Sequence, residues 1–188
     1  MPGDWVETVL SFWFDELRPA AWFRADRALD AEIRRRFLGL WEALRAAPPV
    51  APDGRTAVAA AVVFDQFPRN MFRGTAQAYA TDALAREVAR TALSAGLDRG
   101  LADPERQFLY MPFQHSEDPA DQQTSVALFA GLALRGARAT AEAHRAVIDR
   151  FGRFPHRNAV LSRASTPEEI EHLRATRRRF ERGAAEPS

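Results

Sequence analysis

Cysteine is absent from this chain of 188 residues, and lysine is absent as well. The missing thiol excludes disulfides, cysteine nucleophiles, iron–sulfur clusters and every zinc site that needs cysteine. The missing amine excludes Schiff-base chemistry and the lysine of a phosphate-binding P-loop. All 26 basic residues are therefore arginines.

Long apolar runs are also missing, since no stretch approaches the roughly 18 residues that a membrane-spanning helix needs. The first residues carry no basic segment followed by an apolar one, so they do not resemble a secretory signal. The formal net charge is only +1, with 25 acidic residues among the basic ones. We therefore expect a cytoplasmic protein with neither a membrane nor a nucleic acid as partner. The sequence does not indicate an oligomeric state.

The apolar residues recur at helical spacing along the whole chain, and no segment alternates as a strand does. Helix-starting residues precede these stretches, and they are Asp4, Asp26, Asp103, Asp118 and Thr166. The pattern predicts an all-α fold of about eight or nine helices. We expect a single helical domain over residues 1–182 and a disordered tail over residues 183–188.

Prolines and aromatic residues give further local expectations. The apolar helix that begins near Thr56 should stop before Pro68, and Pro112 should end or kink its helix, because proline has no N–H to donate. A helix of small residues should start near Thr75. We expect Trp22 and Phe23 to insert into the core.

Three polar segments stand at these helix ends, and they are Asp65–Asn70, Met111–Asp118 and Arg153–Asn158. The first reads Phe-Pro-Arg-Asn and the third Phe-Pro-His-Arg-Asn, each just after an apolar helix. One interpretation is a helix stop, in which proline blocks the helix and asparagine tolerates a left-handed backbone. The other is a shared cleft that receives polar side chains from all three segments.

In the shared-cleft interpretation, arginine offers a planar fork of donors for a carboxylate or phosphate, and histidine can transfer protons near neutral pH. Asp65 and Glu117 should pair with Arg69 and Arg157. The candidate ligand-binding residues are Asp65, Gln66, Arg69, Asn70, Arg73, His115, Glu117, Asp118, His156, Arg157 and Asn158. The candidate catalytic residues among them are His115, Asp65, Glu117 and His156.

Simpler roles compete with these. His115 suits the C-cap of its helix, Asp118 suits an N-cap, and His144 lies on an apolar stripe, where one hydrogen-bond partner would satisfy it. His115, His156 and Asp65 could also bind a metal ion, but nothing in their spacing requires one. We therefore predict neither a metal site nor a cofactor.

The polar segments resemble the bacterial family known as domain of unknown function 924. The matching stretches are Phe64 to Asn70, Phe72 to Thr75, Ala80 to Asp82, Tyr110 to Asp118 and Arg153 to Asn158. The resemblance covers roughly residues 4 to 175 and implies an α-α superhelix of the tetratricopeptide-like type. It implies no activity, because the family has none assigned.

Two functions remain open from the sequence. The first is a binding domain whose polar pocket accepts a small anionic ligand or an acidic peptide end. The second is a small hydrolase in which His115 or His156 is the acid–base. A desolvated pocket containing His115 and Asp65 would favour chemistry, whereas an open groove of arginines and aromatic rings would favour binding.

Overall fold

The computed structural model describes residues 5–183, with side chains as far as residue 176. Every regular element in that range is helical, which confirms the all-α fold. In chain order the elements are α1 (Trp5–Leu10), the π-helical η1 (Ser11–Glu16), the 3-10 turn η2 (Pro19–Ala21), α2 (Arg27–Ala46), α3 (Gly54–Ala61), the π-helical η3 (Val62–Gln66), α4 (Phe67–Met71), the 3-10 turn η4 (Ala76–Tyr79), α5 (Asp82–Ser94), α6 (Asp103–Gln114), α7 (Pro119–Ala130), α8 (Ala137–Phe151), the 3-10 turn η5 (Pro155–Arg157) and α9 (Pro167–Gly183). The expected cap Asp4 and residues 184–188 of the expected tail lie outside the described residues.

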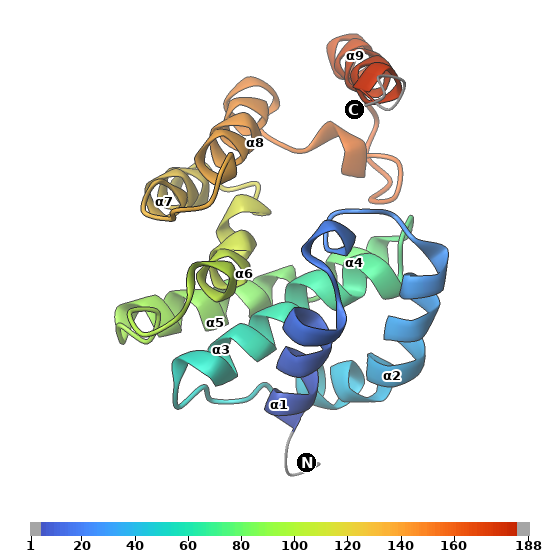
Figure 1. Ribbon diagram of the computed structural model, residues 1–188. Helices are drawn as coiled ribbons and strands as arrows, with labels where there is room; N and C mark the ends of the chain where they lie inside the picture. Colours follow the sequence, from blue (N-terminus) through green and yellow to red (C-terminus); the bar gives the residue numbers. More distant parts are fainter. Residues whose placement is uncertain (1–4, 184–188) are drawn as a thin grey trace.

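The centre of the molecule is the helix formed by α3 and η3 (Figure 1). Every residue from Ala57 to Asp65 has no exposed surface. The run of alanines in α3 allows α1, α5 and α6 to pack closely around it. A helix that is apolar on all sides is buried on all sides, as this one is.

Helix α2 packs against α4 and closes one side of this core. Asp26 caps α2 as predicted, because its carboxylate accepts from the backbone N–H groups of Ala28 and Leu29 at 2.8 and 3.2 Å. The apolar stripe of α2 is buried, and the ring of Phe37 stacks on that of Phe67 in α4 at a centroid distance of 4.5 Å. This contact holds α4 and the polar residues that follow it against the core.

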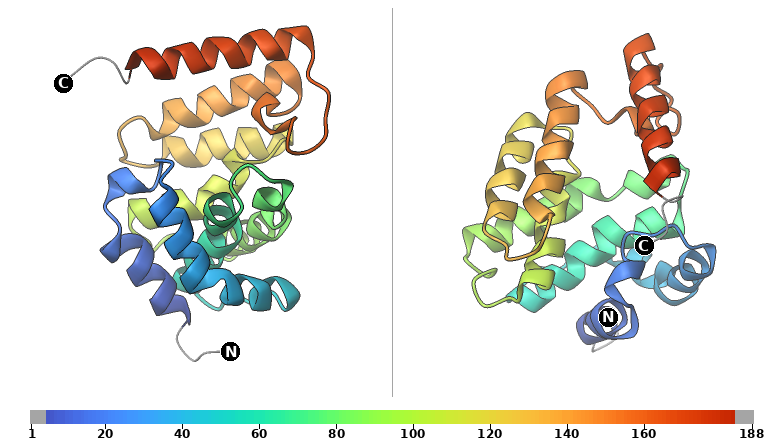
Figure 2. Two further views of the ribbon diagram at one scale, coloured as in Figure 1. Left: turned by 90° about the vertical axis from the view of Figure 1, so that its right-hand side faces the viewer. Right: turned by 45° about the horizontal axis from the view of Figure 1, so that its top comes forward.

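Helices α7, α8 and α9 lie at the end of the molecule away from α1 and α2 (Figures 1 and 2). Gly152, with a left-handed φ of 66°, ends α8 as expected. The predicted capping box of α9 is present, since Thr166 N–H donates to Glu169 at 2.7 Å and Glu169 N–H donates to the Thr166 hydroxyl at 3.2 Å. Between α8 and α9 the chain makes the turn η5, which carries part of the polar site.

One proline does not stop its helix where the sequence predicted. The chain stays helical through Pro68, which lies in the first turn of α4. Pro112 lies inside α6, which ends two residues later at Gln114. The missing N–H of Pro68 would leave the Phe64 carbonyl without its helical donor. The hydroxyl of Thr81 donates to that carbonyl instead, at 2.6 Å. A partner from a distant segment therefore makes the proline acceptable inside the helix.

Two further expectations were wrong. Phe23 does not insert into the core, because 61% of its surface is exposed. The helix expected from Thr75 is only the short 3-10 turn η4. Among the described residues, none of the helices combines the length and the apolar character that crossing a bilayer requires.

Candidate functional site

The three polar segments meet in space around His115. This residue is the C-cap of α6, so its expected structural role is present. Its ring also contacts Asp65 at the end of η3, while Arg157 of η5 donates from Nη2 to the His115 backbone carbonyl at 2.9 Å. Residues 42 to 50 positions apart in the sequence therefore form one cluster.

The centre of the cluster is a buried carboxylate–imidazole pair. Both oxygens of Asp65 lie near Nδ1 of His115, at 2.9 and 2.8 Å. Asp65 is completely buried, and the His115 side chain is 14% exposed. Arg69, one turn after Asp65, places Nη1 3.1 Å from the same carboxylate, and the side-chain amide of Gln66 donates to it as well. The π-helical geometry of η3 holds the carboxylate at this position, and π-helical turns often occur at functional sites.

The charges around this pair fix its protonation state. Burial opposes ionisation of Asp65, but the positive charge of Arg69 and the contact with His115 hold its pKa at about 2. Burial lowers the pKa of His115 to about 4, against the opposing effect of Asp65. At neutral pH the His115 ring is therefore neutral and carries its proton on Nδ1, which donates a hydrogen bond to the ionised carboxylate of Asp65. No described residue forms a hydrogen bond with Nε2, which is then the free basic nitrogen.

Two arginines of the cluster share the carboxylate of Asp82 at the start of α5. Arg69 binds it with two nitrogens, at 3.0 and 3.1 Å. Arg157 reaches it only at 3.6 Å, which exceeds a hydrogen bond, and its Nε has no partner among the described residues. The guanidinium of Arg157 lies between the rings of Tyr79 and Phe154, at 4.7 and 4.6 Å. Arg157 is thus held rigidly while part of its donor capacity is unused.

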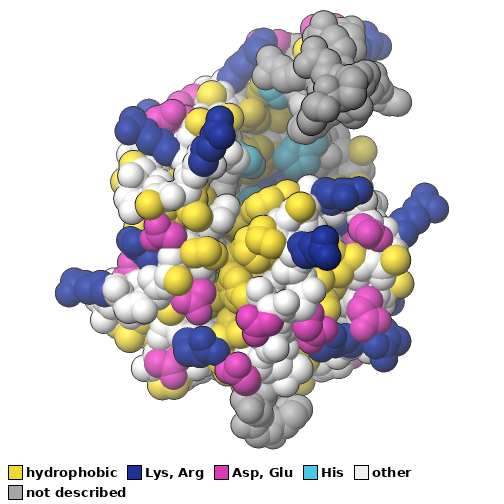
Figure 3. All heavy atoms as spheres, in the orientation of Figure 1, with side chains coloured by type: hydrophobic (Ala, Val, Ile, Leu, Met, Phe, Trp, Pro, Cys, Tyr) yellow, Lys and Arg dark blue, Asp and Glu magenta, His cyan; other side chains and the backbone are white. Residues whose placement is uncertain are grey.

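These groups surround a polar pocket of about 290 Å³. Its lining is Arg69, Arg73, Gly74, Ala78, Tyr79, His115, His144, His156 and Arg157. Histidine side chains are visible in the hollow beneath α8 and α9 (Figure 3). Burial lowers the pKa of His144, so at neutral pH the positive charge of the pocket comes from arginine.

A second hollow of about 300 Å³ adjoins the polar pocket on the side of the loop before α2. Both cavities are lined by Arg69, Arg73 and His115, so the imidazole faces each of them. The second hollow adds Trp22, Phe23, Arg24, Ala25, Gln66, Asn70 and Met111. His115 therefore stands where the polar pocket meets a second compartment that combines arginines with aromatic and thioether side chains.

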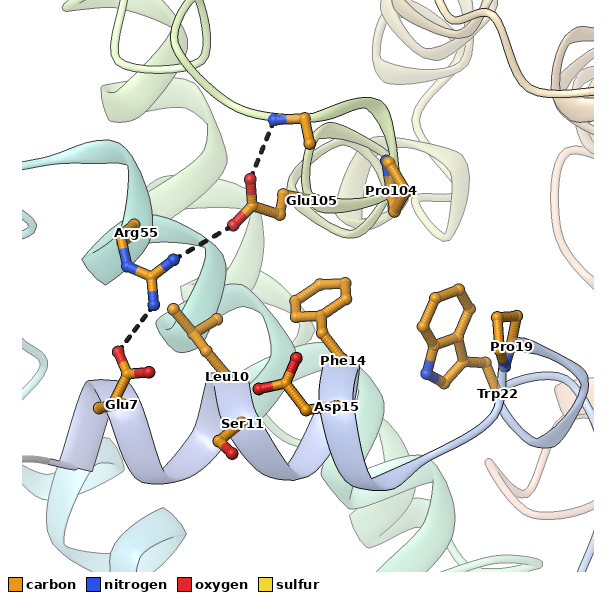
Figure 4. A pocket seen from close by; sticks show the side chains of 11 residues that line it. Glu7, Leu10, Ser11, Phe14, Asp15, Pro19, Trp22, Arg55, Pro104 and Glu105 are labelled. Atoms are coloured by element: carbon orange, nitrogen blue, oxygen red, sulfur yellow. Dashed lines mark hydrogen bonds and ion pairs between the residues drawn. The ribbon is translucent and has the colours of Figure 1, made fainter.

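Two other cavities fit a reaction site less well. A groove of about 520 Å³ between α8 and α9 is mostly apolar and touches the polar pocket at His144 and His156. A cavity of about 390 Å³ lies beside α1, η1 and the start of α6 (Figure 4). At one end of it Arg55 bridges Glu7 and Glu105, at 2.7 and 3.6 Å, so these charges neutralise one another. Within the part of the chain that the structure describes, no three potential ligand side chains are grouped to hold a metal ion.

Two of the predicted site residues, Glu117 and Asp118, support turns outside the pocket. The expected pairing of Glu117 with Arg157 was wrong. Glu117 instead pairs with Arg163 at 2.7 Å and accepts from the backbone N–H of Phe154 at 2.8 Å. Asp118 caps α7 by accepting from the backbone N–H of Ala120 at 2.7 Å. These side chains hold the turn after α6 and η5 in place.

Asn158 is buried and donates to the hydroxyl of Ser165 at 3.0 Å, but its φ of −56° is right-handed, not left-handed as the helix-stop interpretation expected. Asn70 and Arg73 both bind Asp30 of α2, at 2.8 Å and at 2.7 and 2.8 Å. They line the cavities with much of their donor capacity already occupied. Of the predicted residues, Arg69, Arg73, His115, His156 and Arg157 line the polar pocket and Gln66 and Asn70 line the second hollow, while the buried Asp65 contacts His115.

The sequence argument missed two residues that line the pocket, Tyr79 and His144, and it missed Asp82, the partner of the two arginines. Tyr79 and Asp82 lie in or next to short turns, and no local pattern marks them apart from the Ala-Thr-Asp stretch that ends at Asp82. His144 was expected to be a core histidine with one partner. It has such a partner, the Thr140 carbonyl at 2.9 Å, but it also lines the pocket. The helical stripe alone could not reveal the opposing turn η5.

Comparison with known proteins places this site in context. The family model described as bacterial protein of unknown function (DUF924) matches residues 9–177. The solved structure of the protein of unknown function ATU0120 from Agrobacterium tumefaciens is 39% identical, covers 89% of this chain and 96% of its own, and has a TM-score of 0.83. No match was found among curated proteins.

Proposed function

The chain belongs to the DUF924 family of bacterial proteins of unknown function, and we propose that it is a hydrolase of small anionic esters. The observation that carries the proposal is the buried Asp65 carboxylate on Nδ1 of His115, with Nε2 free beside a pocket of arginines. The sequence left a binding domain and a hydrolase open, and this desolvated pair favours the hydrolase.

The pair suits general-base catalysis. Nε2 of His115 accepts a proton from a water molecule as the water oxygen bonds to the ester carbon or phosphorus. The imidazolium that forms lies 2.8 Å from the ionised Asp65, which stabilises it. The bond to the leaving oxygen then breaks, and the imidazolium returns the proton to that oxygen. The overall reaction converts ester and water into acid and alcohol.

Arg157 is the proposed anchor for the anionic group of the substrate. Arg69 is engaged by two aspartates and Arg73 by Asp30, whereas Arg157 retains unused donors and is 8% exposed. Planar guanidinium groups bind carboxylate and phosphate through paired, charge-assisted hydrogen bonds. The contacts of Arg157 with the rings of Tyr79 and Phe154 restrict its guanidinium group, so little side-chain entropy is lost on binding.

The test is turnover of p-nitrophenyl phosphate, mono-p-nitrophenyl succinate and the neutral p-nitrophenyl acetate. We expect an anionic ester to be preferred, His115→Gln to lower kcat by about 10²- to 10⁴-fold, and Arg157→Ala to act mainly on KM. Arg138→Ala, on the exposed face of α8, is the matched control and should change neither. Turnover absent for all three esters, or His115→Gln within twofold of wild type, would contradict the proposal.

A binding function without chemistry is the second candidate. It is favoured by the low pKa of His115, about 4, because a base that weak removes a proton from water less readily. In that case the three esters would not be hydrolysed, while an anion such as phosphate would still bind and Arg157→Ala would weaken its binding.

A further inference from the structure

The cavity on the far side of His115 carries a feature that the anion site does not explain. Among the described residues, three large apolar side chains are strongly exposed, and they are Phe23, Val50 and Ile170. Phe23 alone of these lines one of the cavities around His115. Phe23 lies at the edge of a polar cavity with 61% of its surface exposed, so a ligand ring that covered it would remove apolar surface from water.

The position of Phe23 is fixed by the aromatic residues beneath it. Trp22 donates from its indole N–H to the backbone carbonyl of Trp13 at 2.8 Å, and its ring packs edge-on against Phe108 at 5.0 Å. The ring of Phe23 lies nearly parallel to that of the buried Phe108, at an interplanar angle of 9°. This arrangement presents Phe23 as a wall of the second hollow.

The second hollow is also lined by Met111 and Gln66, whose thioether sulfur and side-chain amide nitrogen lie 3.8 Å apart. Methionine sulfur and phenylalanine rings both make favourable contacts with aromatic ligands. The volume of about 300 Å³ accommodates a ring with substituents. The lining of this compartment is thus suited to a flat ring.

We infer that the substrate has two parts, with an anionic group beside Arg157 and an aromatic or heteroaromatic ring against Phe23. The inference rests on the proposed function, since it makes His115 the residue at the junction of the two compartments. The two cavities share Arg69, Arg73 and His115 and therefore adjoin, and the inferred substrate extends from one into the other. Phe23 is then a specificity-determining residue, and it selects the ring rather than taking part in the reaction.

The experiment uses ligands that contain no ester bond and so cannot be turned over. Isothermal titration calorimetry compares methylphosphonate with phenylphosphonate, and acetate with benzoate, on the full chain. We expect the aromatic member of at least one pair to bind five- to tenfold more tightly. Phe23→Ala should remove that preference and leave the affinity for the small anion within twofold. Val50→Ala, at an even more exposed apolar residue that lines neither cavity, should leave the preference intact.

The possible outcomes separate this inference from the proposed function. One outcome is that the small anions bind with an affinity that Arg157→Ala lowers, while the aromatic ligands bind no more tightly than the small anions. That result refutes the two-part substrate and leaves the anion site in place. A ring preference that persists in Phe23→Ala also refutes the role of Phe23. If none of the four ligands binds, the anion site of the proposed function has failed together with the inference.

Discussion

The protonation of His115 makes the stability of the protein depend on pH in a defined window. Its pKa is lowered from 6.5 in the unfolded chain to about 4 in the native state. Between these values the unfolded chain binds a proton that the native state does not bind, so stability falls as the pH is lowered. The difference corresponds to about 3 kcal/mol, since each pH unit contributes about 1.4 kcal/mol. Above pH 6.5 this contribution is fully present.

The assay is urea unfolding followed by tryptophan fluorescence at pH values from 7.5 to 4.5. Wild type should lose about 2 to 3 kcal/mol from this residue as the pH falls from 6.5 to 4.5, and His115→Gln should lack that part of the slope. His144→Gln leaves the pair of His115 and Asp65 intact, so this variant should keep most of the pH dependence of stability. Only the slopes are compared, so a variant of lower overall stability is still informative. Parallel curves for wild type and His115→Gln would refute the argument.

Three substitutions test the packing that supports the site. Asp65→Asn should cost about 3 to 5 kcal/mol in urea unfolding, because it breaks a buried ion pair; a cost below 1 kcal/mol would contradict the assigned pairing. Thr81→Val should be less stable than Thr81→Ser by about 1 to 3 kcal/mol, since it leaves a buried carbonyl without a donor, and equal stabilities would count against that bond. Gly54→Ala should cost about 1 to 3 kcal/mol through overpacking, because its Cβ would lie 2.4 Å from the Leu97 carbonyl oxygen. Gly39→Ala meets no atom within 4 Å and should raise the melting temperature, so a similar response of both glycine variants would be inconsistent with the clash.

The helices were predictable because their signals are local. Asp26, Asp118 and Thr166 each cap a helix at the position that the sequence indicated. The contact of Asp65 with Arg69 was also predictable, since residues four apart lie on one helical face. The tetratricopeptide-like arrangement that the resemblance implies stays a prediction, and so do the cytoplasmic location and the absence of a metal.

The errors came from contacts between distant segments. The sequence indicated that Arg157 needs an acidic partner. It did not indicate that the partner is Asp82 and not Glu117, because that depends on how η5 is placed relative to the start of α5. In the same way, nothing near Phe23 showed that Trp22 alone would turn towards the core. Side-chain partners from separate elements are decided by packing, and local periodicity carries no information about it.

The hydroxyl of Thr81 connects two buried segments of the core through one hydrogen bond that it donates and one that it accepts. It donates to the Phe64 carbonyl and accepts from the indole N–H of Trp41, at 3.2 Å, so its rotor has a single orientation. Trp41 is fully buried, and the residue after Thr81 is Asp82, the shared partner of the two arginines. Hydrogen–deuterium exchange at that indole therefore requires an opening that breaks its bond to Thr81, next to Asp82 in the chain. The indole proton of Trp41 can thus serve as a built-in spectroscopic reporter of opening at the segment that leads into the pocket.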